Sequence, residues 1–118
     1  MTSVNESIWA AVRACRDVLD EANGSDPQEL TCRVLKVAEE AGEAAGAWIG
    51  VLGQNPRKGV THTRAEVAGE LADVALAALI AIESLGFDAR EVLDDCAGKV
   101  GARLAAAAGA VPAAVSRD

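Results

Sequence analysis

Residues 71–82 read Leu-Ala-Asp-Val-Ala-Leu-Ala-Ala-Leu-Ile-Ala-Ile, and Asp73 is the only polar side chain among them. A helix that is apolar on every side is typical of a central, buried position. Burying an unpaired carboxylate costs several kcal/mol or forces it to take up a proton. We therefore expect a buried helix here, in which Asp73 needs a charged partner if it is to stay ionised.

Start signals for helices lie on either side of this stretch. Three segments combine a capping Asp or Thr with a Glu three residues later: Asp26-Pro27-Gln28-Glu29, Thr63-Arg64-Ala65-Glu66 and Asp88-Ala89-Arg90-Glu91. Apolar residues at helical spacing also run from about Asn5 to Ala22. The sequence thus predicts helices over about 5–22, 27–52, 63–85 and 88–108, with a Gly- and Pro-containing loop over 53–62 and no strands.

The chain has the length of one domain, and the short connections favour a particular architecture. The 118 residues are 51% hydrophobic, which is enough for a single core. Short connections between helices predict an all-α, four-helix antiparallel bundle in one domain, residues 1–118, with its core at about 5–108 and a disordered tail at 109–118. Because the third helix needs more cover than one thin chain provides, we expect a homo-oligomer that packs helices across a two-fold axis.

Two short acidic clusters, residues 39–43 and 70–73, lie on successive predicted helices. Each contains a pair spaced i, i+3, which places the two carboxylates on one helix face with Cβ atoms about 5–6 Å apart. The pairs are Glu40 with Glu43 and Glu70 with Asp73. Helices packed side by side would bring four like charges together, which oppose one another's ionisation unless protons or a cation intervene. Carboxylate ligands suit Mg²⁺ or Mn²⁺, so the spacing predicts a divalent-metal site.

Other interpretations of the clusters have specific sequence requirements. Taken alone, the first cluster also fits a solvated helix face on which Lys36 pairs with Glu40 at i, i+4. A di-iron carboxylate bundle needs Glu-x-x-His motifs, and the sole histidine, His62, follows no such Glu. A non-catalytic helical oligomer, acting as a regulatory or interaction module with structural metal ligands, stays open.

Charge and composition limit the classes of partner. The net charge of −7 disfavours a nucleic-acid polymer as partner, because that affinity rests on Lys and Arg. The longest uncharged run is too short for a bilayer, and the N-terminus lacks the pattern of a secretory signal, so we expect a cytoplasmic protein without a membrane partner. Cys15, Cys32 and Cys96 are odd in number and far apart, which predicts reduced, buried small side chains.

The motif Glu39-Glu40-x-x-Glu43, followed by Glu70-x-x-Asp73, resembles the paired motif of the MazG-like, all-α nucleoside triphosphate pyrophosphohydrolases. The resemblance covers about residues 30–85. It implies that Glu40, Glu43, Glu70 and Asp73 coordinate Mg²⁺, with Mn²⁺ as a possible substitute. Glu39 would be the catalytic group that orients the attacking water, a support for the ligands, or a ligand for a further metal. The implied reaction is hydrolysis of a nucleoside triphosphate to the monophosphate and pyrophosphate, in homodimers or dimers of dimers that serve nucleotide-pool housekeeping.

The same resemblance suggests substrate contacts, since relatives use polar residues on the last helix and between the acidic helices. The candidates are Lys99 and Arg103 for phosphates, Arg57 and Lys58 from the loop, and Trp48 to stack on a base. Ordinary surface charges, and a core position for Trp48, are the alternatives. The last helix lacks the Asn that some relatives use, which leaves the base open. A phosphoribosyl-nucleotide pyrophosphohydrolase would share the metal site and differ in the sugar and base pocket.

Overall fold

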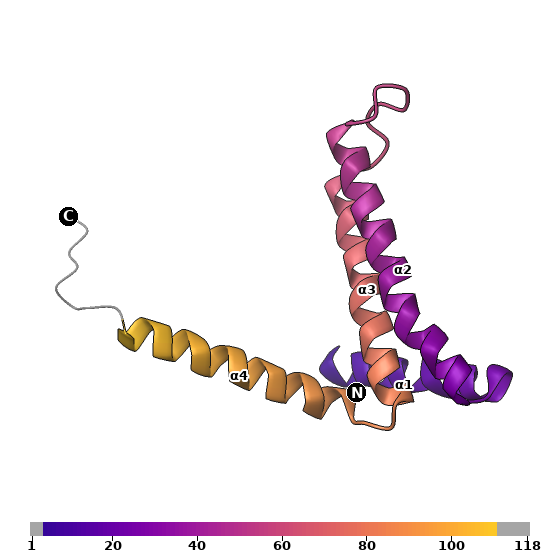
Figure 1. Ribbon diagram of the computed structural model, residues 1–118, viewed down its shortest axis with the longest axis vertical. Coiled ribbons are helices and arrows are strands. Elements are labelled where there is room, and N and C mark those ends of the chain that lie inside the picture. The colour runs from indigo at the N-terminus through magenta and orange to yellow at the C-terminus, as the bar shows by residue number, and fades with distance from the viewer. Residues whose placement is uncertain (1–3, 111–118) are drawn as a thin grey trace. The chain divides into compact units, whose positions relative to one another are not determined.

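The computed structural model describes residues 4–110, which form four α-helices and no strand (Figure 1). The helices are α1 (Val4–Asn23), α2 (Pro27–Leu52), α3 (Arg64–Ser84) and α4 (Ala89–Ala110). The predicted all-α class and the four helices are confirmed, and each predicted boundary falls within one helical turn of the observed one. Gly109 and Ala110 belong to α4, so the expected tail does not begin at residue 109. The rest of that expectation, residues 111–118, lies outside the described residues.

The helix starts are stabilised by the capping residues that the sequence indicates. Asp26 accepts a hydrogen bond from the backbone N–H of Glu29 at 2.8 Å, and Pro27 is the first residue of α2. At α3, Thr63 and Glu66 each accept a hydrogen bond from the other's backbone N–H, which is a complete capping box. These bonds satisfy N–H groups that the first turn of a helix leaves without partners, so the elements are fixed locally.

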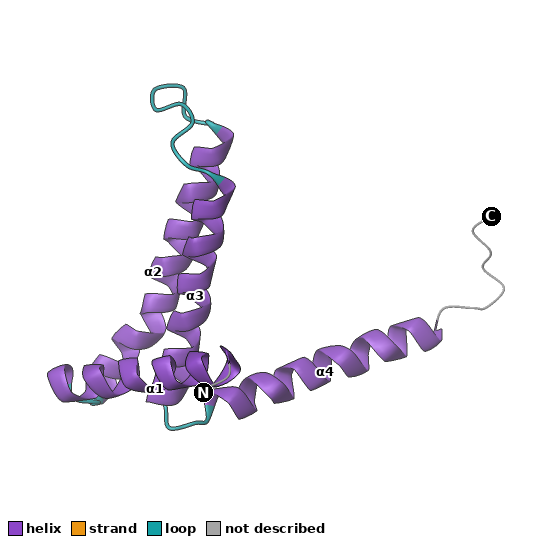
Figure 2. Cartoon of the chain, turned by 180° about the vertical axis from the view of Figure 1, so that it is seen from behind, coloured by secondary structure: helices purple, strands orange, loops and turns teal. Residues whose placement is uncertain are grey.

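The chain divides into two compact units, one ending at Phe87 and the other starting at Asp88. In the first unit α2 and α3 lie antiparallel as a long hairpin, and α1 packs against α3 at the end away from the hairpin loop (Figure 2). Within residues 4–110, the second unit contains a single helix, α4. A single domain spanning 1–118 stays a prediction.

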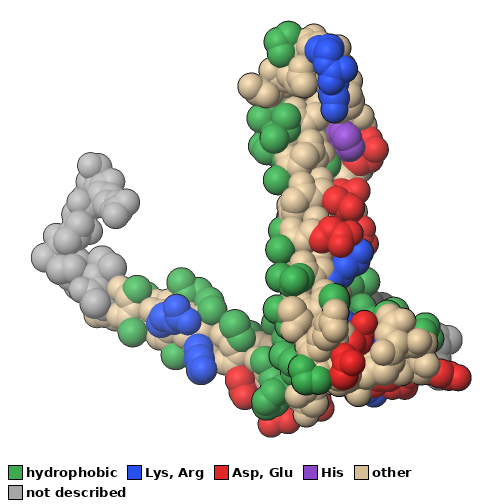
Figure 3. Space-filling model, turned by 45° about the vertical axis from the view of Figure 1, so that its right-hand side comes forward, with side chains coloured by type: hydrophobic (Ala, Val, Ile, Leu, Met, Phe, Trp, Pro, Cys, Tyr) green, Lys and Arg blue, Asp and Glu red, His purple; other side chains and the backbone are tan. Residues whose placement is uncertain are grey.

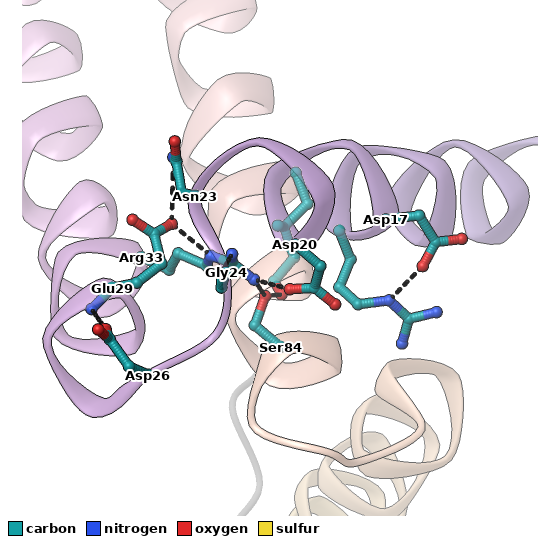
Figure 4. Close-up of polar contacts among 10 residues, drawn as sticks. Asp17, Asp20, Asn23, Gly24, Asp26, Glu29, Arg33 and Ser84 are labelled. Atoms are coloured by element: carbon teal, nitrogen blue, oxygen red, sulfur yellow. Dashed lines mark hydrogen bonds and ion pairs between the residues drawn. The ribbon is translucent and has the colours of Figure 1, made fainter.

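A buried arginine joins the three helices of the first unit (Figure 4). Arg33 on α2 donates to Asp20 of α1 at 2.6 Å, to Glu29 at 2.8 Å, to the Gly24 carbonyl at 2.7 Å and to Ser84 of α3 at 3.1 Å. Its side chain is only 4% exposed. Burial tends to lower the pKa of Arg33, but the hydrogen bonds to Asp20 and Glu29 and the charges of these two carboxylates outweigh it and hold the pKa above its usual value. Arg33 therefore fixes how α1 meets the hairpin.

The expectation that α3 is buried on every side is wrong for a single chain. Leu71 is 56% exposed and Leu76 is 40% exposed, and Asp73 is also exposed. The physical reason is that α2 covers one side of α3 and α1 packs against it near only one end of the hairpin. Buried positions on α3 are confined to its C-terminal half, at Leu79, Ala81 and Glu83.

The prediction of buried cysteines is also wrong. Cys15, Cys32 and Cys96 are all exposed. They lie on helices that each present a large part of their surface to solvent, and a few buried side chains of α1, α2 and α3, such as Val12, Ala47 and Leu79, make up the centre of the first unit. Between residues 4 and 110, no helix combines the length and the apolar character needed to cross a membrane.

Candidate metal centre

Three glutamates from α2 and α3 form a compact acidic group, which we call the glutamate triad. Carboxylate oxygens of Glu40, Glu43 and Glu70 lie within 4.8 Å of one another. The i, i+3 spacing places Glu40 and Glu43 on one face of α2, and the antiparallel pairing of the helices brings Glu70 to the same place. Acidic side chains accordingly run along one side of the hairpin, and hydrophobic side chains run along the other (Figure 3). The predicted meeting of the two acidic clusters is confirmed for these three residues.

Two members of the triad are partly buried, Glu43 is exposed, and the three carboxylates repel one another. The Glu40 side chain is only 14% exposed, and Glu70 is half-buried. The Oε2 atom of Glu70 is buried and has no hydrogen-bond partner. The charge of Glu40 raises the pKa of Glu43 above its usual value, with smaller contributions from reduced solvation and from the charge of Glu70. An orphaned carboxylate oxygen beside two further carboxylates is the donor set that a hard divalent cation satisfies.

Lys36 pairs with the first acidic cluster without neutralising the triad. Its Nζ atom lies 2.9 Å from Glu39 Oε1 and 3.4 Å from Glu40 Oε1. The hydrogen bond to Glu39 is the main cause of the raised pKa of Lys36. Lys36 itself is about half exposed, so the ion pairs face solvent. The surface-pair interpretation of this cluster is thus correct for Lys36, yet among residues 4–110 no lysine forms an ion pair with Glu43 or Glu70.

The other two acidic candidates lie outside the triad. Asp73 is exposed and borders a cleft together with Glu40, one turn along α3 from Glu70. Glu39 is 59% exposed and bound to Lys36. The role of Asp73 as a fourth ligand and the catalytic role of Glu39 both stay predictions.

Two clefts adjoin the triad from opposite ends. The first, which we call the helix cleft, has a volume of about 410 Å³ and lies among α1, α2 and α3. Its lining includes apolar Leu19, Leu76 and Ile80 as well as Glu40 and Asp73. The second, the loop cleft, has a volume of about 460 Å³ and lies between the hairpin helices and their connecting loop. Polar Asn55, Lys58 and His62 line it beside Glu43 and Glu70.

The predicted substrate residues are distributed over three places. Lys58 lines the loop cleft, whereas Arg57 is exposed on the loop and lines neither cleft. Trp48 lies elsewhere, in a shallow apolar hollow with Val67 and Leu71, and the Arg64 guanidinium is 5.3 Å from its ring centre. Lys99 and Arg103 are exposed on α4. Of these residues, only Lys58 shares a cleft with members of the triad.

The sequence did not indicate the roles of two residues: Arg33, which links three helices, and His62, which lines the loop cleft. His62 was assigned to the loop alone, and Arg33 had no assigned partner. A signal for Arg33 was available, because it follows Glu29 at i, i+4 and lies on the same helix face as the apolar Leu30 and Val37, at i−3 and i+4. His62 carried no comparable signal, because its place beside Glu70 depends on how the loop folds.

Comparisons with protein-family models, with curated proteins and with solved structures find no match to this chain. The chemistry of the site therefore rests on the geometry and donor atoms of its own residues.

Proposed function

We propose that this chain is a divalent-metal-dependent nucleotide pyrophosphohydrolase, which cleaves a nucleoside triphosphate to the monophosphate and pyrophosphate. The observation that carries the proposal is the glutamate triad with its buried, partnerless Glu70 Oε2, set between two clefts. The spacing of the acidic pairs on successive helices supports the same activity through its resemblance to the MazG-like enzymes.

The donor set favours Mg²⁺, with Mn²⁺ as a substitute, because it consists of carboxylate oxygens only. Glu40, Glu43 and Glu70 would hold the ion, and Asp73, one turn further along α3, would complete the set as a fourth ligand. A bound divalent ion offsets phosphate charge and makes a coordinated water more acidic. Glu39 is exposed beside the triad and could orient that water and accept its proton, with Lys36 holding the carboxylate in place.

The two clefts differ in a way that suits the two ends of a nucleotide. The helix cleft offers apolar side chains on which a base can lie, and its lining also includes polar Asn23. The loop cleft offers Lys58, Asn55 and backbone from glycines, which suit phosphate oxygens. The triad lies between them, where the triphosphate of a substrate spanning both clefts would pass. A metal supplies the positive charge that a protein of net charge −7 otherwise lacks.

We further propose that the active form is a homodimer or dimer of dimers built on a four-helix bundle. The apolar hollow around Trp48, with Val67, Leu71 and Val74, lies open on the hairpin. On α4, the apolar side chains of Val92, Leu93, Val100 and Leu104 are also exposed. Contiguous apolar surface of this kind is typical of protein interfaces. Assembly would cover these side chains and, as the family resemblance implies, allow Lys99 and Arg103 to contact phosphates.

The first test is pyrophosphate release from a panel of normal and modified nucleoside triphosphates and a phosphoribosyl nucleotide, run with Mg²⁺, Mn²⁺ or EDTA. We expect metal-dependent release from at least one member and none in EDTA. Glu70→Gln should abolish turnover, whereas Glu21→Gln, an exposed substitution on α1, should not change it. Full activity of Glu70→Gln would refute the proposal. Mg²⁺ binding without turnover of any member would favour the non-catalytic metal-binding module instead.

A further inference from the structure

The loop between α2 and α3 is folded back onto the end of α2. Gly53 takes the left-handed conformation with φ of 62°, and its N–H bonds to the Ile49 carbonyl. Further along, the Thr61 N–H donates to the Gly50 carbonyl at 2.9 Å, and the Gly59 N–H donates to the Asn55 carbonyl at the same distance. These bonds fix the loop against the helix, so the wall that it contributes to the loop cleft is built by defined contacts.

Gly50 is where the loop comes closest to α2. A Cβ atom at Gly50 would lie 2.4 Å from His62 Nδ1 and 2.4 Å from Thr61 Oγ1. No side chain larger than hydrogen fits there unless both loop residues move. Gly42, on the same helix, has nothing within 4 Å of the equivalent position. A glycine at position 50 is therefore what allows the imidazole to lie against the helix at the edge of the cleft.

The position of the ring leaves one nitrogen available to a ligand. His62 Nδ1 and Thr61 Oγ1 are 2.8 Å apart, which is a hydrogen bond. If the threonine hydroxyl donates, the imidazole carries its proton on Nε2 and can donate it in turn. His62 is half-buried and lines the loop cleft with Lys58, Glu43 and Glu70. With its proton on Nε2, His62 would be a donor on the same cleft as two members of the glutamate triad.

The charges around the loop cleft indicate which class of ligand His62 would contact. Two carboxylates and one ammonium group line the cleft, so without a metal their net negative charge should repel a free anion. With a divalent ion on the triad, the balance reverses, and an anion can contact the ion, Lys58 and His62 together. The cleft has no aromatic side chain apart from the imidazole and has small residues, Gly46, Ala47 and Gly50, along α2. That lining suits phosphate groups better than a base.

We propose that His62 is a substrate-contacting residue, which donates from Nε2 to the diphosphate portion of a metal-bound nucleotide and is held in place by Gly50. The inference rests on the proposed function for the identity of the nucleotide, and the same contact would bind inorganic pyrophosphate as the product. Lys58 supplies charge to this diphosphate, whereas His62 supplies a directed hydrogen bond that fixes its orientation.

The first experiment uses the fact that His62 is the only histidine of the chain. Imidazole resonances of untagged protein are followed by NMR while pyrophosphate is added, first in EDTA and then with Mg²⁺. We expect no saturable shift in EDTA and a saturable shift when both Mg²⁺ and pyrophosphate are present. Glu70→Gln should abolish the shift. A resonance that stays unchanged while Mg²⁺ and pyrophosphate bind would overturn the proposal.

The second experiment tests the contact by substitution. His62→Ala should raise both KM for the nucleotide and the inhibition constant of pyrophosphate about tenfold or more, the effect of losing a hydrogen bond to a charged group. His62→Gln, which retains a donor, should recover part of the loss. Gly50→Ala should reproduce the defect by displacing the ring, whereas Gly42→Ala should not. Unchanged KM and inhibition constant in His62→Ala would refute the contact.

The two experiments separate this inference from the proposed function. If the wild type hydrolyses a nucleotide but the His62 resonances do not shift with Mg²⁺ and pyrophosphate, the proposed activity is supported and the His62 contact is refuted. A shift of the imidazole on adding Mg²⁺ and pyrophosphate, without hydrolysis of any nucleotide, would support the His62 contact and refute the activity.

Discussion

Glu70 has one carboxylate oxygen that is buried and lacks a hydrogen-bond partner, although the next residue, Leu71, is 56% exposed. Leaving such an atom unsatisfied costs about 1–3 kcal/mol. This cost and the repulsion within the triad both lower the stability of the metal-free protein. Such a loss of stability is expected where side chains are arranged to bind a ligand.

This arrangement predicts opposite effects of Glu70→Gln on stability without and with metal. Removing one charge from the triad relieves repulsion, so the metal-free variant should melt at the same temperature as the wild type or higher. A metal stabilises a protein only if it binds the folded state, so Mg²⁺ should raise the melting temperature of the wild type and leave the variant unchanged. Thermal melts with EDTA and with Mg²⁺ check this. A variant that Mg²⁺ stabilises as much as the wild type would exclude Glu70 as a ligand.

The raised pKa of Glu43 gives a pH dependence with a definite sign. The group binds its proton more tightly in the folded, metal-free protein, mainly because of the charge of Glu40. Its contribution to stability is therefore fully present below the ordinary glutamate value of about 4.3 and is lost as pH rises through the raised value. Because a metal must displace this proton, the affinity for Mg²⁺ should weaken as pH falls through the same window.

The measurement is the rise in melting temperature that a fixed Mg²⁺ concentration causes, taken from about pH 5 to about pH 7. We expect the rise to grow with pH in the wild type. In Glu43→Gln, the part of this pH dependence that belongs to Glu43 should disappear. A rise that is the same at every pH would contradict the coupling between proton and metal.

At the scale of the elements, Arg33 connects α1, the turn after it, α2 and α3 through four hydrogen bonds. Arg33→Met should lower the free energy of unfolding by about 3 kcal/mol, because it leaves partly buried carboxylates without their donor. The value lies at the lower end for a buried pair, since Asp20 is 40% exposed and water can reach it. Urea unfolding followed by circular dichroism measures the change.

The matched control is Arg16→Met, which removes an arginine from α1 whose partner Asp17 is its exposed neighbour in sequence. Exposed pairs contribute about 0–1 kcal/mol, so this variant should unfold close to the wild type. Equal destabilisation by the two substitutions would show that the Arg33 hydrogen bonds contribute no more to the free energy of unfolding than an exposed ion pair does. Because Arg33 also lines the helix cleft, its loss should reduce activity through the position of α1.

At the scale of the whole molecule, the two sides of the α2–α3 hairpin have different chemistry (Figure 3). Leu71→Asp places a charge in the apolar hollow beside Trp48, so it should convert the proposed oligomer to monomers. Val18→Asp is the control, because Val18 is 67% exposed on α1 and lies outside the hollow. Sedimentation velocity reports the mass of each species. A wild type that is monomeric at all concentrations would refute the assembly.

The sequence determined the helices of this protein by itself, because capping and apolar periodicity act within a few residues. Asp26 with Glu29, Thr63 with Glu66 and Asp88 with Glu91 each bond across a single turn, and each was identifiable from residue type and spacing. The i, i+3 spacing likewise placed Glu40 beside Glu43 without knowledge of any other element.

Tertiary structure decided what depends on contacts between elements far apart in the chain. It brought Glu70 to the pair on α2 while leaving Asp73 outside the group, because the pairing of antiparallel helices sets which turns lie opposite one another. It also placed His62 on the cleft, through a close approach at Gly50 that residue types alone do not reveal. Burial was the property least available from sequence. Asp73 and Cys32 are exposed because the α2–α3 hairpin covers only one side of each of its helices, and Cys15 on α1 and Cys96 on α4 are exposed as well.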